Sequence, residues 1–158
     1  MIFCGAAALI AVVFFAALMA KGGGTINAVN TAAGTREGAC VGRFAETALG
    51  VPYLVVSKGT VAGKDVIPCA ATGAVPLGFA LDAADVGEPV AIAMGFGKTV
   101  FGVASAAIAA DVPVYTAAGG ELSSTGGAGK YLMGRSVTAA AADNDVFELM
   151  PCFPVLQA

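Results

Sequence analysis

The sequence contains no histidine and no tryptophan, and only 12% of its 158 residues are charged. Histidine is the side chain that most often serves as a general base and as a ligand for transition metals, so its absence removes the commonest basis for both kinds of site. The net charge is −3, and the eight lysine and arginine residues form no cluster. We therefore expect no binding of nucleic acid, which requires basic side chains to neutralise phosphates.

Cysteine is scarce as well. The four cysteines are Cys4, Cys40, Cys69 and Cys152, and no two of them form a C-x-x-C pair. Without histidine they match no zinc-site spacing, and no base stands near any of them to activate a nucleophile. Cys69 and Cys152 lie in apolar, strand-like stretches, where a free cysteine behaves as a small hydrophobe. We predict that both are buried thiols, and the disulfide state of the cysteines stays open.

Acidic residues gather in two short stretches. Asp82, Asp85 and Glu88 form the first, and Asp143 and Asp145 form the second. Paired acids can serve a glycosidase or bind calcium, but the calcium-loop pattern is absent from both stretches. Aspartate also favours turns, because its side chain bonds its own backbone. We interpret these acids as turn residues, and we predict no catalytic residue, no cofactor, no metal and no enzyme activity.

One tripeptide, Gly97-Lys98-Thr99, matches the centre of a phosphate-binding loop. That loop also needs a glycine five positions earlier, where this chain has Ile92, and it must lead into a helix. Here the following residues are β-branched and aromatic, which favours a strand. We therefore interpret residues 95–97 as a hairpin connection between two strands, with Gly95 and Gly97 at its positive-φ positions.

The N-terminal 20 residues differ from the rest of the chain. Residues 2–20 carry no charge and are long enough to span a bilayer, which suits a membrane anchor. A signal peptide and an upstream extension that precedes a start at Met19 are the alternatives. Residues 21–38 are rich in glycine and threonine, and they predict a flexible arm.

Residues 39–158 predict a β domain. Short runs of valine, isoleucine, leucine and aromatic residues recur about every ten residues, separated by glycine, proline and aspartate, which is typical of an all-β protein. The predicted strands cover residues 39–45, 53–57, 65–69, 77–81, 89–94, 98–104, 113–116, 131–138 and 146–150. We expect a single compact β-barrel or β-sandwich, with no helix longer than three turns.

Two stretches of this domain resemble each other. Residues 76–94 align with residues 132–150, and each consists of a strand, a connection with alanine and aspartate, and a strand that ends in methionine. Upstream, residues 63–70 resemble residues 109–116 at a different offset. The pattern predicts two related β units, although alanine-rich β sequence can also match itself by chance.

The order of these features resembles that of tailed-phage capsid cement proteins, also called head decoration proteins. The matches include Leu77-Gly78-Phe79-Ala80, Gly87-Glu88-Pro89-Val90, Val112–Tyr115, Gly119-Gly120 and Met133-Gly134. The resemblance extends over residues 36–152, and its motifs are of low complexity. Two features depart from the family pattern: Asp111-Val112-Pro113 stands where the family has Gly-Asp before its valine, and the apolar N-terminus is foreign to such proteins.

The resemblance implies a non-enzymatic β-barrel protein of the virion that binds the outside of a capsid and stabilises it. It implies the major capsid protein as partner and a homo-oligomer, often a trimer. The alternative is a bacterial β domain with a binding role, exported to the periplasm or anchored in the membrane. In either case, contact with a membrane is expected only through residues 2–20.

Overall fold

The computed structural model describes residues 40–61, 65–94 and 98–158, all of which belong to one compact unit. Both predicted N-terminal segments, residues 1–20 and 21–38, lie outside the described residues. The described part is nearly all β, as predicted, and its only helix is the short 3-10 helix η1 (Ala118–Gly120). None of its helices is long and apolar enough to cross a membrane.

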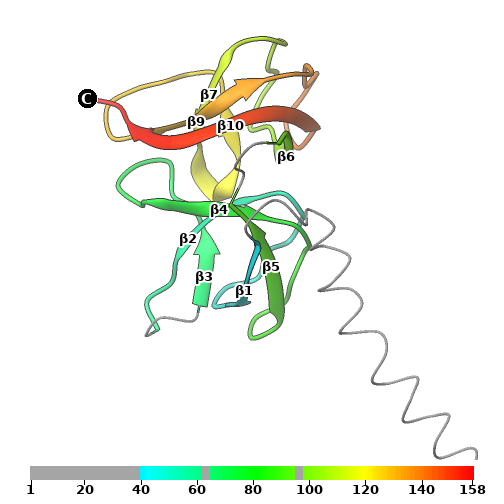
Figure 1. Cartoon of the computed structure of the whole chain (residues 1–158), viewed down its shortest axis with the longest axis vertical. Coiled ribbons are helices and arrows are strands. Elements are labelled where there is room, and N and C mark those ends of the chain that lie inside the picture. The colour runs from blue at the N-terminus through cyan, green and yellow to red at the C-terminus, as the bar shows by residue number, and fades with distance from the viewer. Residues whose placement is uncertain (1–39, 62–64, 95–97) are drawn as a thin grey trace, which may run out of the picture. The chain divides into compact units, whose positions relative to one another are not determined.

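Ten strands make up the described part of the chain, and Figure 1 shows their arrangement. They are β1 (Cys40–Ala45), β2 (Val55–Lys58), β3 (Asp65–Pro68), β4 (Pro76–Ala80), β5 (Pro89–Ala93), β6 (Val100–Val103), β7 (Pro113–Thr116), β8 (Leu122–Ser123), β9 (Tyr131–Ser136) and β10 (Val146–Leu156). All nine predicted strands are present. Strand β8 was not predicted, and β10 runs six residues beyond its predicted end at Met150.

The first five strands close into a barrel in the order β1-β3-β2-β4-β5. Strand β1 closes it, because it pairs with β5 in an antiparallel ladder and with β3 in a parallel one. The last five strands form a second, curled sheet in the order β6-β10-β9-β7-β8. A single parallel bridge between Ala104 and Leu122 links the two ends of this sheet.

The two sheets are repeats of one structure, which we call the first repeat (β1–β5) and the second repeat (β6–β10). Their strand order is the same when β1, β2, β3, β4 and β5 are matched with β6, β7, β8, β9 and β10. The contact that brings the two ends of each sheet together also matches. In the first repeat Glu46 N–H donates to Val66 O at 2.9 Å, and in the second Ser105 N–H donates to Leu122 O at 2.8 Å.

Bonds between the strand ends and the long turns also recur. Ala45 N–H donates to Glu88 O and Ala104 N–H donates to Asp145 O, at 2.9 Å in both repeats. Isolated antiparallel bridges join Leu49 to Ala84 in the first repeat and Ile108 to Ala140 in the second. Backbones with positive φ recur at Tyr53 (68°) and Asp111 (60°), and at Gly87 (81°) and Asn144 (65°). The prediction of two related β units is therefore confirmed, and each unit forms a sheet of its own.

Two details of the prediction were wrong. The match of residues 63–70 with 109–116 equated β3 with β7, whereas strand order makes β7 the equivalent of β2. The predicted hairpin at residues 95–97 does not exist as a strand pair, because β5 pairs with β1 and β4 while β6 pairs with β10. The stretch instead connects the two repeats. Gly95 and Gly97 themselves lie outside the described residues.

Each repeat has its own apolar core, and the two cores exchange side chains where the repeats join. Val55, Cys69 and Phe79 of the first repeat pack in the core of the second repeat. In return, Val103 of the second repeat packs in the core of the first. Because burial of each such side chain stabilises the fold by roughly 1.5–3 kcal/mol, this join is part of the folded unit.

Polar contacts fix the relative orientation of the repeats at the join. Gly120 N–H donates to Cys69 O at 2.9 Å, and Thr116 Oγ1 donates to Ala71 O at 2.8 Å. The rings of Tyr53 and Phe101 also meet, with their centroids 5.3 Å apart.

Candidate interaction surface

The acidic residues that the sequence singled out lie in turns, as predicted. In the first repeat, Glu88 accepts a hydrogen bond from Asp85 N–H at 3.0 Å. In the second, the Asp145 carboxylate accepts bonds from the N–H groups of Ala141 and Ala142 at 2.8 and 2.9 Å. These acids order their own turns. Over residues 40–61, 65–94 and 98–158, no group of three or more Cys, Asp or Glu side chains is placed to hold a metal ion.

The cysteines confirm one prediction and correct another. Cys69 is buried, and burial raises the pKa of its thiol to about 11, so it is protonated at neutral pH. Cys152, also predicted to be buried, is exposed, because β10 extends past Met150 along the surface of the second repeat. Its Sγ lies 3.8 Å from Leu132 O as a weak donor. Cys69 and Cys152 are free thiols.

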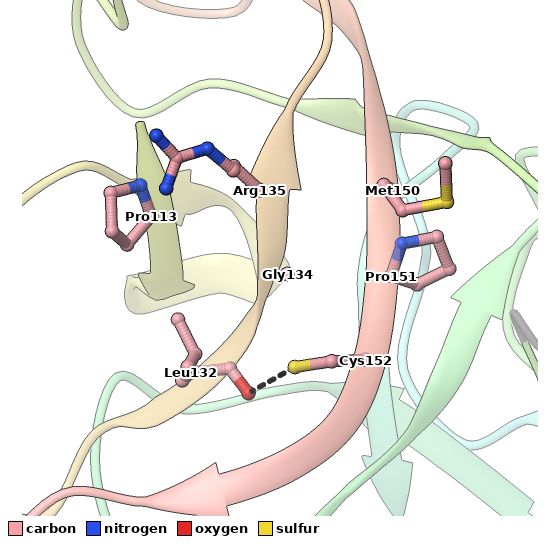
Figure 2. Close-up of a pocket in the computed structure, with 7 residues that line it drawn as sticks. All are labelled: Pro113, Leu132, Gly134, Arg135, Met150, Pro151 and Cys152. Atoms are coloured by element: carbon pink, nitrogen blue, oxygen red, sulfur yellow. Dashed lines mark hydrogen bonds between the residues drawn. The ribbon is translucent and has the colours of Figure 1, made fainter. Parts of the chain in front are cut away.

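Cys152 lines a shallow pocket on the outer face of the second repeat (Figure 2). The pocket has a volume of about 320 Å³ and is built on β7, β9 and β10. Its lining residues are Pro113, Leu132, Gly134, Arg135, Met150, Pro151 and Cys152. All but Arg135 are uncharged, and a concave, mostly apolar surface of this kind favours a partner's apolar side chain over a charged ligand.

Gly134 allows the strands beneath the pocket to approach each other closely. A Cβ atom on Gly134 would clash with the carbonyl oxygen of Met150 and lie 2.9 Å from the Cα of Pro151. Gly78, its equivalent in the first repeat, approaches Ala93 in the same way. Gly134 therefore contributes only backbone to the lining of the pocket.

An ion pair stands at the edge of the pocket. The Arg135 guanidinium donates a hydrogen bond to the Asp111 carboxylate, and 56% and 83% of these side chains are exposed. The hydrogen bond from Arg135 lowers the pKa of Asp111, and the positive charge of Arg135 lowers it further. Because both groups are in contact with water, the pair contributes little to stability. It gives the apolar pocket a polar rim.

The last part of β10 exposes further apolar side chains. Phe153, Val155 and Leu156 are all exposed, next to the pocket residues Met150 and Cys152. Pro151 and Pro154 lie in the same stretch and lack an N–H donor, which reduces the tendency of a strand edge to pair with other chains. No residue from 149 to 156 is charged.

Sequence reasoning predicted no site, and it did not identify this surface. The pocket residues come from three separate strands, and the motifs that include Pro113 and Gly134 do not indicate that these strands form a common surface. One signal was available: the run of residues 149–156, which is apolar and contains two prolines.

Comparison with solved structures finds a protein of similar fold. No family model matches the chain, and no curated protein matches its sequence. Among solved structures, the chain is similar to the N base of the head fiber protein gp8.5 of bacteriophage phi29, with a TM-score of 0.58 and 16% sequence identity. The similarity covers 77% of this chain and 99% of that one. At this identity the likeness shows the fold alone, and the fold is one found in a structural protein of a phage head.

Proposed function

We propose that this protein is a structural virion protein that binds the outside of a phage capsid and stabilises it. The observation that carries this proposal is the similarity in fold to a phage head fiber base over nearly all of that base. The sequence motifs, which resemble those of capsid cement proteins, point to the same kind of protein. The major capsid protein is the proposed partner, and the capsid surface is the proposed location.

The exposed apolar surface of the second repeat supports a role in binding a large assembly. A contiguous run of exposed apolar side chains, such as the one that includes Phe153, Val155 and Leu156, is typical of a surface that a partner covers. The centres of protein interfaces are depleted of charge, as the 149–156 stretch is. We propose that this stretch contributes to attachment.

Stabilisation of the capsid follows from binding alone, without turnover of a substrate. A ligand that binds only the assembled shell shifts the equilibrium towards the shell by mass action. Many copies on a symmetric lattice multiply a modest contact, because each copy bridges subunits that must separate before the shell opens. The family resemblance further implies a homo-oligomer, and we propose a trimer.

The test is co-sedimentation of the full chain with empty shells assembled from the major capsid protein of the proposed phage. We expect the chain to pellet with shells and to raise their melting temperature. Leu156→Asp should weaken attachment about tenfold or more, because a charge would be buried in the contact. Val86→Asp changes another exposed apolar residue, in a turn of the first repeat, and should bind as the parent does.

A different outcome would favour the alternative function. A chain that stays in the supernatant with shells but partitions into membrane vesicles would contradict capsid decoration. It would support an anchored or exported β domain that uses residues 2–20 as its anchor.

A further inference from the structure

The end of β10 forms a two-stranded ribbon with β9. The ladder between β10 and β6 ends at Leu149, whereas the ladder between β10 and β9 continues to Leu156. Figure 1 shows this part of β10 running past β6 towards the C-terminus. In the first repeat, the equivalent strand β5 ends at Ala93, which corresponds to Met150 in the register against the neighbouring strand. The ribbon is therefore an addition to the structure that the two repeats share.

Both faces of the ribbon expose apolar side chains. Successive strand residues point to opposite faces of a sheet, so Val155 and Leu156 lie on opposite faces of the ribbon. Val155 is opposite Leu132, a pocket residue, and Leu156 is opposite Tyr131, which packs against the core of the second repeat. Val155 and Leu156 are nevertheless 50% and 56% exposed. A strand that covers a core buries one of two successive side chains, whereas this strand end buries neither of them.

The ribbon is suited to contact through its faces rather than through its edge. Pro151 and Pro154 have no N–H group, so β10 offers fewer donors to a strand that would pair with it. No residue from 149 to 156 is charged, which matches an apolar partner surface and not a charged one. A flat partner would cover the side chain on one face and leave the apolar side chain on the other face in water. A cleft with two apolar walls covers both faces at once.

We propose that this ribbon inserts into an apolar cleft between two neighbouring subunits of the assembled capsid, with one wall against Val155 and the other against Leu156. The inference rests on the proposed function and gives it a defined contact. Walls that belong to different subunits explain how attachment stabilises the shell, because separation of the subunits would return both apolar faces to water. A cleft of this kind exists only in the assembled shell, so the ribbon favours the shell by mass action.

The experiment measures co-sedimentation of the full chain with empty shells of the major capsid protein, over a range of chain concentrations. Val155→Asp and Leu156→Asp should each weaken binding about tenfold or more, because each variant would bury an unpaired charge against one wall. The double variant should lose the product of the two factors, because the two side chains contact different walls. Val86→Asp changes an exposed apolar residue in a turn of the first repeat; it is the control and should bind as the parent does.

A melting curve of each free variant shows whether the fold is intact. Val155 and Leu156 are exposed at the end of the last strand, so the charged variants should melt as the parent does. Val155→Thr and Leu156→Thr form a second pair, because threonine keeps a side chain that favours strands and replaces apolar surface by a hydroxyl. Each threonine variant should weaken binding in the same direction as the matching aspartate variant and by a smaller factor.

Binding to the unassembled capsid protein separates a cleft between subunits from a site on one subunit. We expect the chain to bind shells and not to bind unassembled subunits at the same concentration. Equal binding to both would overturn the inference, and so would a variant on one face that binds shells as the parent does, since a flat partner touches one face only.

Sedimentation velocity of the free chain tests the other occupant. Self-association of the parent that both aspartate variants abolish would make a second copy the partner of the ribbon and overturn the inference. In all of these outcomes the parent still pellets with shells, and the proposed function stands. A parent that stays in the supernatant would instead refute the proposed function, and the inference with it.

Discussion

Gly134 and Gly78 show how a single residue determines the geometry of each repeat. Each lies in a strand where a Cβ atom would strike the backbone of the neighbouring strand, at Met150 for Gly134 and at Ala93 for Gly78. Because backbone atoms of a ladder cannot move aside cheaply, only glycine fits. Both glycines belong to the motifs that carried the family resemblance, so the resemblance has a physical basis at these positions.

Replacement of Gly134 by alanine should destabilise the protein by about 1–3 kcal/mol, the usual cost of overpacking a well-packed site. Denaturant unfolding followed by circular dichroism would measure this. The matched control is Gly42→Ala, since Gly42 also lies in a strand but has no atom within 4 Å of the position of a Cβ. It should change stability by no more than about 0.5 kcal/mol. Equal effects at both positions would contradict the close approach at Gly134.

Single residues were predictable from the sequence where local chemistry decides their role. The acids of the two turns were recognised because aspartate and glutamate bond nearby N–H groups, as Glu88 and Asp145 do. Cys69 was recognised by its apolar neighbours. Cys152 was not, because its exposure depends on the course of β10, which no residue near it in the sequence determines.

At the scale of elements, strands were predictable where an apolar run lies between turn residues. Strand β8 was missed because it has two residues, of which only Leu122 is apolar and buried. The end of β10 was missed because Pro151 and Pro154 suggest the end of a strand. A shift of register against β9 between Pro151 and Val155 accommodates both prolines, and pairing resumes at Val155 and Leu156.

Strand partners were less predictable than strands. The connection after β5 looked like a hairpin because two strands follow each other closely with glycine between them. Closure of the first barrel gives β5 its partners, β1 and β4, and leaves β6 to pair with β10. Partner choice depends on this long-range closure, which short-range sequence signals do not contain.

Glu46 links the end of β1 to the turn that follows β2, and it makes this link dependent on pH. Its carboxylate accepts bonds from the Thr60 hydroxyl and from the Thr60 and Val61 N–H groups, with the Thr60 N–H bond at 2.6 Å. The Thr60 hydroxyl, above all, holds the pKa of Glu46 below its usual value. A lowered pKa in the folded state means that the carboxylate stabilises the fold above its unfolded-state pKa and that this stabilisation is lost as the pH falls through the folded value.

We therefore expect the melting temperature to fall on acidification from about pH 6 to pH 3, and to fall less in Glu46→Gln. Thermal unfolding across this range would measure both. Thr60→Val removes the largest cause of the shift and should give an intermediate slope. Asp82→Asn removes an exposed turn carboxylate and serves as the control. An unchanged slope in Glu46→Gln would show that the link does not contribute to stability.

At the scale of the whole molecule, the sequence predicted two related β units but not how they join. The join requires that Val55 and Phe79 face away from their own barrel and enter the core of the other repeat. In the sequence these residues are ordinary strand positions, and alternation along a strand does not say which neighbour covers its outer side. The pocket could not be predicted for the same reason, since its residues become a surface only when β7, β9 and β10 lie side by side.

The predicted arm at residues 21–38 is the part of the chain whose contribution we expect to be separable from folding. The described β fold begins at Cys40, and among the described residues the members of both apolar cores start at Ala45. With glycine and threonine prominent and few large apolar residues, the arm has little to add to a core. Such a segment adds contact area when it orders on a neighbour, at a cost in entropy that lowers affinity but does not cancel it.

Deletion of residues 21–38 should therefore weaken attachment to shells about tenfold or more while leaving the melting temperature of the free protein unchanged. Co-sedimentation with empty shells and a melting curve of each free protein would measure the two effects separately. A replacement of equal length by glycine and serine is the control, because it keeps the spacing between residues 20 and 39 but removes the threonine and asparagine side chains of the arm. Weak attachment in both variants would show that side chains of the arm contact the shell, whereas recovery with the replacement would show that only its length matters. An equal loss of stability and attachment would instead show that residues 21–38 belong to the folded unit, contrary to what their composition predicts.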